Sequence, residues 1–146
     1  MPGNDRALTR MVELHKALGH PLRLRLVAML RDGPLCVCQM TGLLRRAAST
    51  VSEHLSELRR AGALQERKEG RWVEYRLSDD PVTLAAVEAA WPELERDPDV
   101  RADLVLLREL RRVPLEEICR VNLDLARLPR LARVVEKANR LRASQP

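Results

Sequence analysis

Residues 49–62, STVSEHLSELRRAG, decide the fold that we predict for this chain. The apolar residues of this segment recur at the spacing of one helical face: Val51, Leu55, Leu58 and Ala61. Ser49 is a suitable N-cap, and Gly62 suits the left-handed turn that ends many helices. The segment therefore predicts a short amphipathic helix that presents serine, threonine and histidine near its start.

A second short helix is predicted just before it, at about residues 35–44, with a tight connection between the two. Two short helices joined in this way are typical of a helix-turn-helix, whose second helix enters the major groove of DNA. Residues 63–68 and 72–77 then indicate short strands joined across Glu69-Gly70-Arg71, which predicts a β-hairpin. A hairpin directly after a helix-turn-helix is a wing.

Helices are predicted on both sides of this unit. Residues 6–18 carry a helical apolar pattern, and Pro21 begins a second helix that runs to Leu30. Pro81, preceded by two aspartates, begins a helix to about residue 95, and residues 97–146 indicate further helices. We therefore predict a mainly α fold with a small β-hairpin. It is a winged helix-turn-helix over residues 1–96 with flanking helices and an extra C-terminal helical tail over residues 97–146.

The composition is that of a soluble globular protein. Of the 146 residues, 45% are hydrophobic, 32% are charged and only 2% are aromatic, so an aliphatic core is expected. No apolar run approaches the roughly 18–20 residues that cross a membrane, and the first ten residues lack the apolar core of a signal peptide. We expect a cytoplasmic protein, without membrane contact, whose three cysteines are reduced at rest.

Charge is distributed unevenly along the chain. The net charge is +5, made up of +3 in residues 1–40, +3 in 41–76, −6 in 77–110 and +5 in 111–146. Excess positive charge favours polyanions such as DNA, although merely solvated basic proteins share it. Charge by itself is therefore a weak indication of the partner.

Four segments together resemble the ArsR/SmtB family of metal-sensing transcriptional repressors. They are ALGHPLRLRLVAML (17–30), LCVCQM (35–40), STVSEHLSELRRAGAL (49–64) and GRWVEYRL (70–77), and the resemblance covers about residues 5–95. It implies a homodimer whose flanking helices form the dimer interface and which binds double-stranded operator DNA until a metal releases it. No permanently bound cofactor and no enzyme activity are expected.

Cys36 and Cys38 indicate the type of signal. LCVCQM resembles the motif of the arsenic-sensing members, which implies trivalent arsenic or antimony as inducer. Those members often carry a third cysteine three residues later, where this chain has Thr41. Thiolates are the soft ligands that such ions prefer. Residues i and i+2 of a helix point about 200° apart, so binding must distort the start of the helix or use a frayed first turn.

Cys119 is the candidate third sulfur. It lies on an apolar stripe beyond the matched region, so it is equally a small buried hydrophobic residue. As a ligand it requires the tail to fold back over the helix-turn-helix or to come from the partner subunit. Without it, a two-sulfur site suits a metalloid that carries one carbon substituent.

The DNA-binding residues are predicted on the second helix, in the turn before it and at the tip of the wing. Short polar side chains suit base edges and phosphates, and arginines suit phosphates: Ser49, Thr50, Ser52, His54, Arg45, Arg46 and Arg71. Each arginine is equally consistent with a solvated surface residue, and His54 with a packing role. The acidic Glu53 and the absence of glycine at 45–47 depart from the family pattern.

Three alternatives remain open from the sequence. A repressor of the same fold can sense thiol oxidation or a soft divalent metal, although the 81–95 helix has no histidine and no cysteine precedes Cys36. A cysteine-dependent arsenate-detoxifying enzyme needs an anion-cradling loop, and neither a C-x5-R loop nor a glycine-rich phosphate loop is present. A thiol-buffering protein without DNA contact does not explain the polar start of the second helix.

Overall fold

A computed structural model describes residues 2–144 of the chain, with side chains from residue 6 onward. The elements in chain order are α1 (Pro2–Leu18), α2 (Pro21–Leu30), β1 (Leu35–Cys36), α3 (Val37–Leu44), α4 (Ala48–Arg60), β2 (Leu64–Glu69), β3 (Trp72–Leu77), α5 (Pro81–Leu94), α6 (Pro98–Leu110), α7 (Leu115–Arg120), two short 3-10 turns (Leu125–Arg127 and Pro129–Leu131) and α8 (Ala132–Ala143). The predicted fold class, a winged helix-turn-helix with a helical tail, is confirmed. None of the helices among these residues combines the length and the apolar composition that crossing a bilayer requires.

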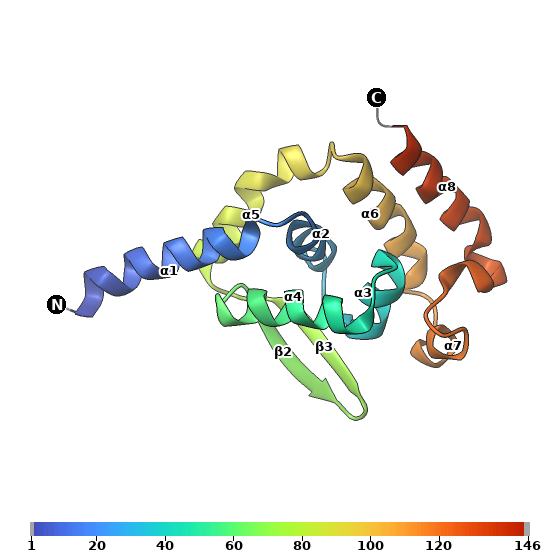
Figure 1. The fold of residues 1–146 in the computed structure, drawn as a ribbon, viewed down its shortest axis with the longest axis horizontal. Coiled ribbons are helices and arrows are strands. Elements are labelled where there is room, and N and C mark those ends of the chain that lie inside the picture. Colours follow the sequence, from blue (N-terminus) through green and yellow to red (C-terminus); the bar gives the residue numbers. More distant parts are fainter. Residues whose placement is uncertain (1, 145–146) are drawn as a thin grey trace.

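The central element is α2, which Figure 1 shows nearly end-on within a ring of the other helices. The ring of His20 caps its first turn by accepting a hydrogen bond from the Leu22 N–H at 3.1 Å, and Pro21 follows at the first helical position. Its last five residues, Leu26–Leu30, are all buried. A helix that is buried on every side belongs at the centre of a core, and the helix-turn-helix is built against it.

The second helix of the helix-turn-helix, α4, buries Val51, Leu55 and Leu58 as predicted. Its start differs from the prediction, because α4 begins at Ala48 after an uncapped Ala47, so Ser49 lies inside the first turn and is not the N-cap. The cause is the left-handed conformation of Arg45 (φ 56°), which ends α3 and reverses the chain early.

The end of α4 is as predicted. Gly62 has a φ of +81°, and its N–H donates to the Arg59 carbonyl at 3.0 Å. The N–H of Ala63 donates to the Leu58 carbonyl at 2.9 Å, which completes a Schellman motif. This motif turns the chain directly from α4 into the first strand of the wing.

The wing is the predicted hairpin of β2 and β3, but it belongs to a three-stranded antiparallel sheet in the order β1-β3-β2. Strand β1 was not predicted. Leu35 pairs with Tyr75 and Cys36 pairs with Glu74, so the helix expected at residues 35–44 begins only at Val37. The physical reason is the hydrogen bonding gained by an extended Leu35-Cys36 along the free edge of β3.

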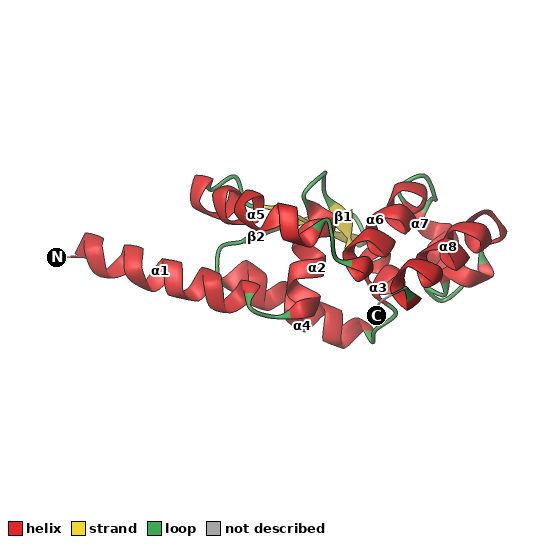
Figure 2. Ribbon diagram, turned by 90° about the horizontal axis from the view of Figure 1, so that it is seen from above, coloured by secondary structure: helices red, strands yellow, loops and turns green. Residues whose placement is uncertain are grey.

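Residues of the predicted tail pack into the same core as the helix-turn-helix. Helix α6 contacts α2 and α3, α7 contacts α3, and α8 lies against α6. The buried side chains of this part join one continuous apolar cluster with those of α2, α3 and α4: Leu106, Leu107, Leu110, Ile118, Leu125, Leu131 and Ala138. Figure 2 shows α1 at one end of the molecule and α7 and α8 at the other. The boundary between residues 96 and 97 stays a prediction.

A buried carboxylate ties α2, α6 and α8 together. Asp103 of α6, only 1% exposed, accepts hydrogen bonds from Arg25 Nε at 2.7 Å and Arg25 Nη2 at 2.8 Å. Arg142 Nη2 of α8 donates to the same carboxylate at 3.0 Å. The hydrogen bond with Asp103 is the main reason that the pKa of Arg25 is raised. Removal of this one charge leaves two cations facing each other in a desolvated site.

We therefore expect Asp103→Asn to lower the free energy of unfolding by about 3–5 kcal/mol, the usual cost of breaking a buried ion pair from one side. Urea unfolding followed by circular dichroism measures it. The control is Glu93→Gln, which removes an exposed carboxylate 3.8 Å from Arg96 and should leave the unfolding midpoint unchanged. Equal midpoints for the two variants would show that the buried triad does not hold the helices together.

Candidate thiol site and nucleic-acid interface

Cys36 and Cys38 line a single groove of about 400 Å³. Cys36 precedes the helix in extended conformation (φ −78°, ψ 152°) as the last residue of β1, and Cys38 lies in the first turn of α3. The separation of about 200° between helical positions i and i+2 therefore does not apply to this pair. The side-chain oxygen of Gln39 accepts a hydrogen bond from the Cys36 N–H at 2.8 Å and fixes the junction between strand and helix.

Both thiols of the groove are protonated at neutral pH. Burial raises the pKa of Cys38 to about 11, with smaller contributions from Cys36 and Cys119. Burial also raises the pKa of Cys36, and Glu74 and Glu69 add to the effect because their negative charges oppose a thiolate. The resting site thus holds two neutral S–H groups in a partly apolar environment.

The other walls of the groove come from the elements predicted to contact DNA. Ser52 of α4 and Arg71 of the wing tip both line it. Side chains of β2, β3 and α3 complete it: Glu66, Trp72, Val73, Tyr75 and Val37. Nothing in the sequence indicated that Ser52 and Arg71 share a surface with the cysteines, because that arrangement depends on the packing of the sheet against the helices.

Cys119 is exposed on α7, which packs against α3 within the same chain. Cys119 is not among the residues that line the groove. Within residues 2–144 no group of three His, Cys, Asp or Glu side chains is arranged to hold a metal ion. The tail folds back over the helix-turn-helix, yet a three-sulfur site is not preformed.

Thr41 is not among the residues that line this groove. It is 5% exposed, and its Oγ1 is buried without a hydrogen-bond partner among the described residues. A hydroxyl in this position does not replace the missing third sulfur.

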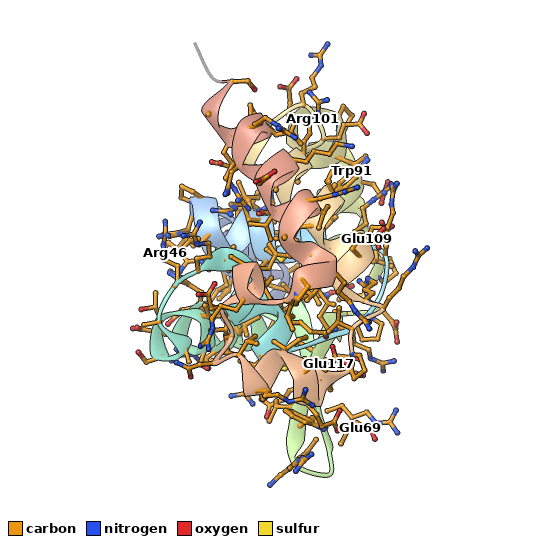
Figure 3. The ribbon with its side chains drawn as sticks, turned by 90° about the vertical axis from the view of Figure 1, so that its right-hand side faces the viewer. Arg46, Glu69, Trp91, Arg101, Glu109 and Glu117 are labelled. Atoms are coloured by element: carbon orange, nitrogen blue, oxygen red, sulfur yellow. The ribbon has the colours of Figure 1, made fainter. Side chains whose placement is uncertain are left out.

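The wing tip contacts the tail as well. Arg71 Nη2 donates to Glu116 Oε1 of α7 at 3.4 Å, and the Arg71 guanidinium lies 5.0 Å from the centre of the Trp72 ring. Figure 3 shows Glu117 of α7 directly above the wing, whose end is marked by Glu69. Glu116 was not predicted, and a single exposed glutamate gives no sequence signal for such a contact.

Most of the predicted DNA-binding residues are accessible. Four of them are exposed around the start of α4: Arg45, Arg46, Ser49 and Ser52. Arg71 is exposed at the wing tip, whereas Thr50 is half-buried. Arg45 adopts the left-handed conformation that glycine adopts without strain, so the turn has the backbone shape for which the glycine of the family pattern is suited.

His54 is placed differently from the other polar residues of α4. It is half-buried, its ring centre lies 4.4 Å from that of His20, and its Nδ1 lies 3.3 Å from Arg23 Nη1. Burial lowers the pKa of His54, and the nearby His20 and Arg23 lower it further. The ring therefore packs against the start of α2, a contact between two histidines that their sequence spacing did not predict.

The loop that leads into β1 is held by the end of α6. Arg111 Nη1 donates to the Pro34 carbonyl at 2.9 Å, and Arg111 Nη2 donates to the Gly33 carbonyl at 3.1 Å. Arg111 therefore fixes the backbone two residues before Cys36. This link was also not predicted, since one arginine among the many of the tail carries no pattern.

Comparison with known proteins identifies the family. The family model "Bacterial regulatory protein, arsR family" matches residues 20–65. The "Arsenical resistance operon repressor" of Escherichia coli K12 is 40% identical over 83 residues, which are 55% of this chain and 71% of that protein. This chain belongs to the ArsR family. An uncharacterised HTH-type transcriptional regulator of Methanocaldococcus jannaschii is 39% identical over 74 residues, or 50% of this chain and 83% of that protein. The solved structure of HlyU from Vibrio cholerae is 34% identical with a TM-score of 0.55, over 66% of this chain and 96% of HlyU.

These ArsR-family relatives are transcriptional regulators and not enzymes, in agreement with the sequence analysis. The matched residues 20–65 contain both cysteines of the groove and the predicted contacts on α4. Cys119, Glu116 and Arg111 lie outside the matched residues, in the part of the chain that folds back onto them.

The His54 contact predicts a pH dependence of stability. Because the folded state lowers the pKa of His54 below its ordinary value of 6.5, protonation favours the unfolded chain, and stability falls as pH decreases through that value. We expect the thermal midpoint to drop between pH 7.5 and pH 5.5, and to drop less in His54→Gln. Ala132→Gln, which places the same amide on an exposed residue of α8 at the other end of the molecule, is the control and should keep the wild-type slope. If all three proteins lose stability equally, His54 is not the group that titrates.

Proposed function

We propose that this ArsR-family protein is a cytoplasmic repressor that binds operator DNA as a homodimer and is released by trivalent arsenic or antimony. The inducer is bound by Cys36 and Cys38, with Cys119 as the candidate third ligand. The observation that carries the proposal is the shared groove, in which both thiols lie beside Ser52 of α4 and Arg71 of the wing. A ligand on the thiols therefore acts directly on the elements that read DNA.

DNA binding is assigned to the start of α4 and to the wing. The exposed Ser49 and Ser52 suit base edges and phosphates, and Arg45, Arg46 and Arg71 suit phosphates. Figure 3 places Arg46 on one side of the molecule and the end of the wing below it, as needed for two separate contacts to one duplex.

The protonated thiols favour a metalloid over a divalent metal. Arsenous and antimonous acids are neutral, and each As–OH group condenses with one S–H to give one As–S bond and one water. A divalent cation must instead displace a proton from each thiol, which is costly where burial opposes the thiolate. Two such condensations with Cys36 and Cys38 leave the third position of the metalloid for Cys119, for hydroxide or for a carbon substituent.

Binding changes the DNA-reading elements through the junction of β1 and α3. Cys36 is held to Glu74 of β3 by strand pairing, whereas Cys38 moves with α3. A bridge between their sulfurs forces strand and helix into one fixed geometry and crowds Ser52 and Arg71. A difference of about 1–3 kcal/mol between the two states lowers operator affinity roughly 5–150-fold.

The homodimer is assigned to α1 and α5. Leu8, Met11 and Val12 of α1 are 70%, 40% and 46% exposed. Leu8 and Val12 point away from the buried Leu14, and Met11 lies at the edge between the exposed and the buried side of the helix. Leu84 of α5 is 41% exposed. An apolar stripe of this kind on a helix that is already packed on its other side suits an interface with a second copy.

The inducer site is tested by operator release. A duplex is first selected with the wild-type chain from a random-sequence library, and binding is then titrated with arsenite by fluorescence anisotropy. We expect Cys36→Ser and Cys38→Ser to bind this duplex like the wild type but to lose at least about 90% of the release, because one sulfur cannot hold the metalloid. Normal release by both variants would place the site elsewhere.

Two further arms of that experiment separate the alternatives. Cys119→Ser distinguishes a two-sulfur site, which keeps its response, from a three-sulfur site, which needs more arsenite. Zn²⁺, Cd²⁺ and hydrogen peroxide replace arsenite in parallel titrations. Release by any of these without release by arsenite contradicts the metalloid assignment and supports a divalent-metal or redox sensor.

The dimer interface is tested by introducing negative charges at its apolar positions. We expect Leu8→Glu combined with Val12→Glu to convert the dimer to monomer in sedimentation velocity, because two carboxylates replace apolar contacts at the interface. Ala132→Glu combined with Ser144→Glu adds the same charge on exposed residues of the opposite end and should leave the dimer intact. A wild-type monomer at micromolar concentration would contradict the assignment.

A further inference from the structure

The C-terminal part of the chain is rich in exposed cations. Residues 125–144 carry a set of exposed cations that we call the basic surface: Arg127, Arg130, Arg133, Lys137 and Arg140. None of them has a carboxylate within ion-pair distance among the described residues, in contrast to Arg142, which is bound by Asp103. The only acidic residue of this segment is Glu136.

In the free protein the cations of the basic surface repel one another, which raises the electrostatic energy of the folded chain. Five cations within fourteen residues repel one another, and neither the fold nor the core requires them, because all five side chains are exposed. A polyanion relieves this repulsion and releases its own counterions when it binds. The chemistry of the surface therefore fits a row of phosphates.

The basic surface continues from the helix-turn-helix. Arg45 lines a hollow of about 120 Å³ together with Ala126 and Asn139. Arg142 lines this hollow as well, and so does the acidic Asp124. The hollow therefore lies between the turn before α4, the first 3-10 turn and α8, and Arg127 and Arg140 adjoin its lining residues in the sequence.

The position of this surface along the molecule indicates where it meets DNA. Figure 1 places α1 at one end of the longest axis and α7 and α8 at the other end. With α1 at the centre of a dimer, the two basic surfaces lie at its outer ends, beyond the half-sites that the two α4 helices read.

We propose that the basic surface binds the phosphates of the duplex outside each half-site, so that the C-terminal part of the chain enlarges the DNA footprint. This inference rests on the proposed function. It is confined to the 3-10 turns and α8, because α7 presents Glu116 and Glu117 toward the wing and these carboxylates repel phosphate. The contact is sequence-independent, because it involves the DNA backbone alone.

The test compares two variants of equal charge. The first replaces four cations of the basic surface, Arg127, Arg133, Lys137 and Arg140, by glutamine. The second replaces four exposed arginines of α6 and its ends, Arg96, Arg101, Arg108 and Arg112, by glutamine. Each variant loses four positive charges, so the two have the same net charge. Figure 3 shows Arg101 and Glu109 on the side away from Arg46, so the second variant is altered far from the turn before α4. Binding to the selected duplex, extended by 15 base pairs of random sequence on each side, is measured between 50 and 300 mM NaCl.

We expect the first variant to have a shallower dependence of log K on log[NaCl], by roughly 2–4 units, because each phosphate that the dimer no longer neutralises lowers the slope by about 0.9. Its hydroxyl-radical footprint should lose the protected flanks and keep the half-sites. The second variant should keep the wild-type slope and footprint. Equal slopes for both variants overturn the inference, whereas failure of the wild type itself to bind duplex DNA overturns the proposed function.

Discussion

The antiparallel pairing of Leu35 and Cys36 with Tyr75 and Glu74 joins the wing to the helix-turn-helix. Two residues in extended conformation link the wing to α3, and they set one cysteine on the sheet and the other on the helix. Without this short strand both cysteines would lie on one helix, pointing apart. With it, they share a groove with Ser52 and Arg71, two of the residues that we propose to contact DNA.

Much of the architecture followed from local chemistry in the sequence. Pro21, Gly62 and Gly70 mark the boundaries of α2, α4 and the wing, because each has a backbone preference that acts without tertiary contacts. Strand β1 could not be predicted, since two residues show no periodicity and extend only because β3 offers a free edge. The contacts of Arg111 with the Gly33 and Pro34 carbonyls, and of His54 with His20, join segments that are distant in sequence and carry no motif.

The thiol chemistry follows from the same packing. Burial between α3 and the wing raises the pKa of Cys36 and of Cys38, which under our proposal suits condensation with the neutral arsenous acid better than capture of a cation. The sequence predicted these two residues as ligands but not their environment, and it left open whether Cys119 was buried or available. The structure exposes Cys119 on a helix of six residues that rests on α3, so a small movement of α7 changes its distance from Cys38.

The buried carboxylate of Asp103 also limits where this chain can be cut. Arg25 lies in the matched family region and Asp103 lies beyond it, yet the two are bound to each other in a desolvated site. The C-terminal part is therefore not a detachable module. A chain shortened to the matched region would lose the partner of the Arg25 guanidinium together with the apolar side chains that the tail adds to the core.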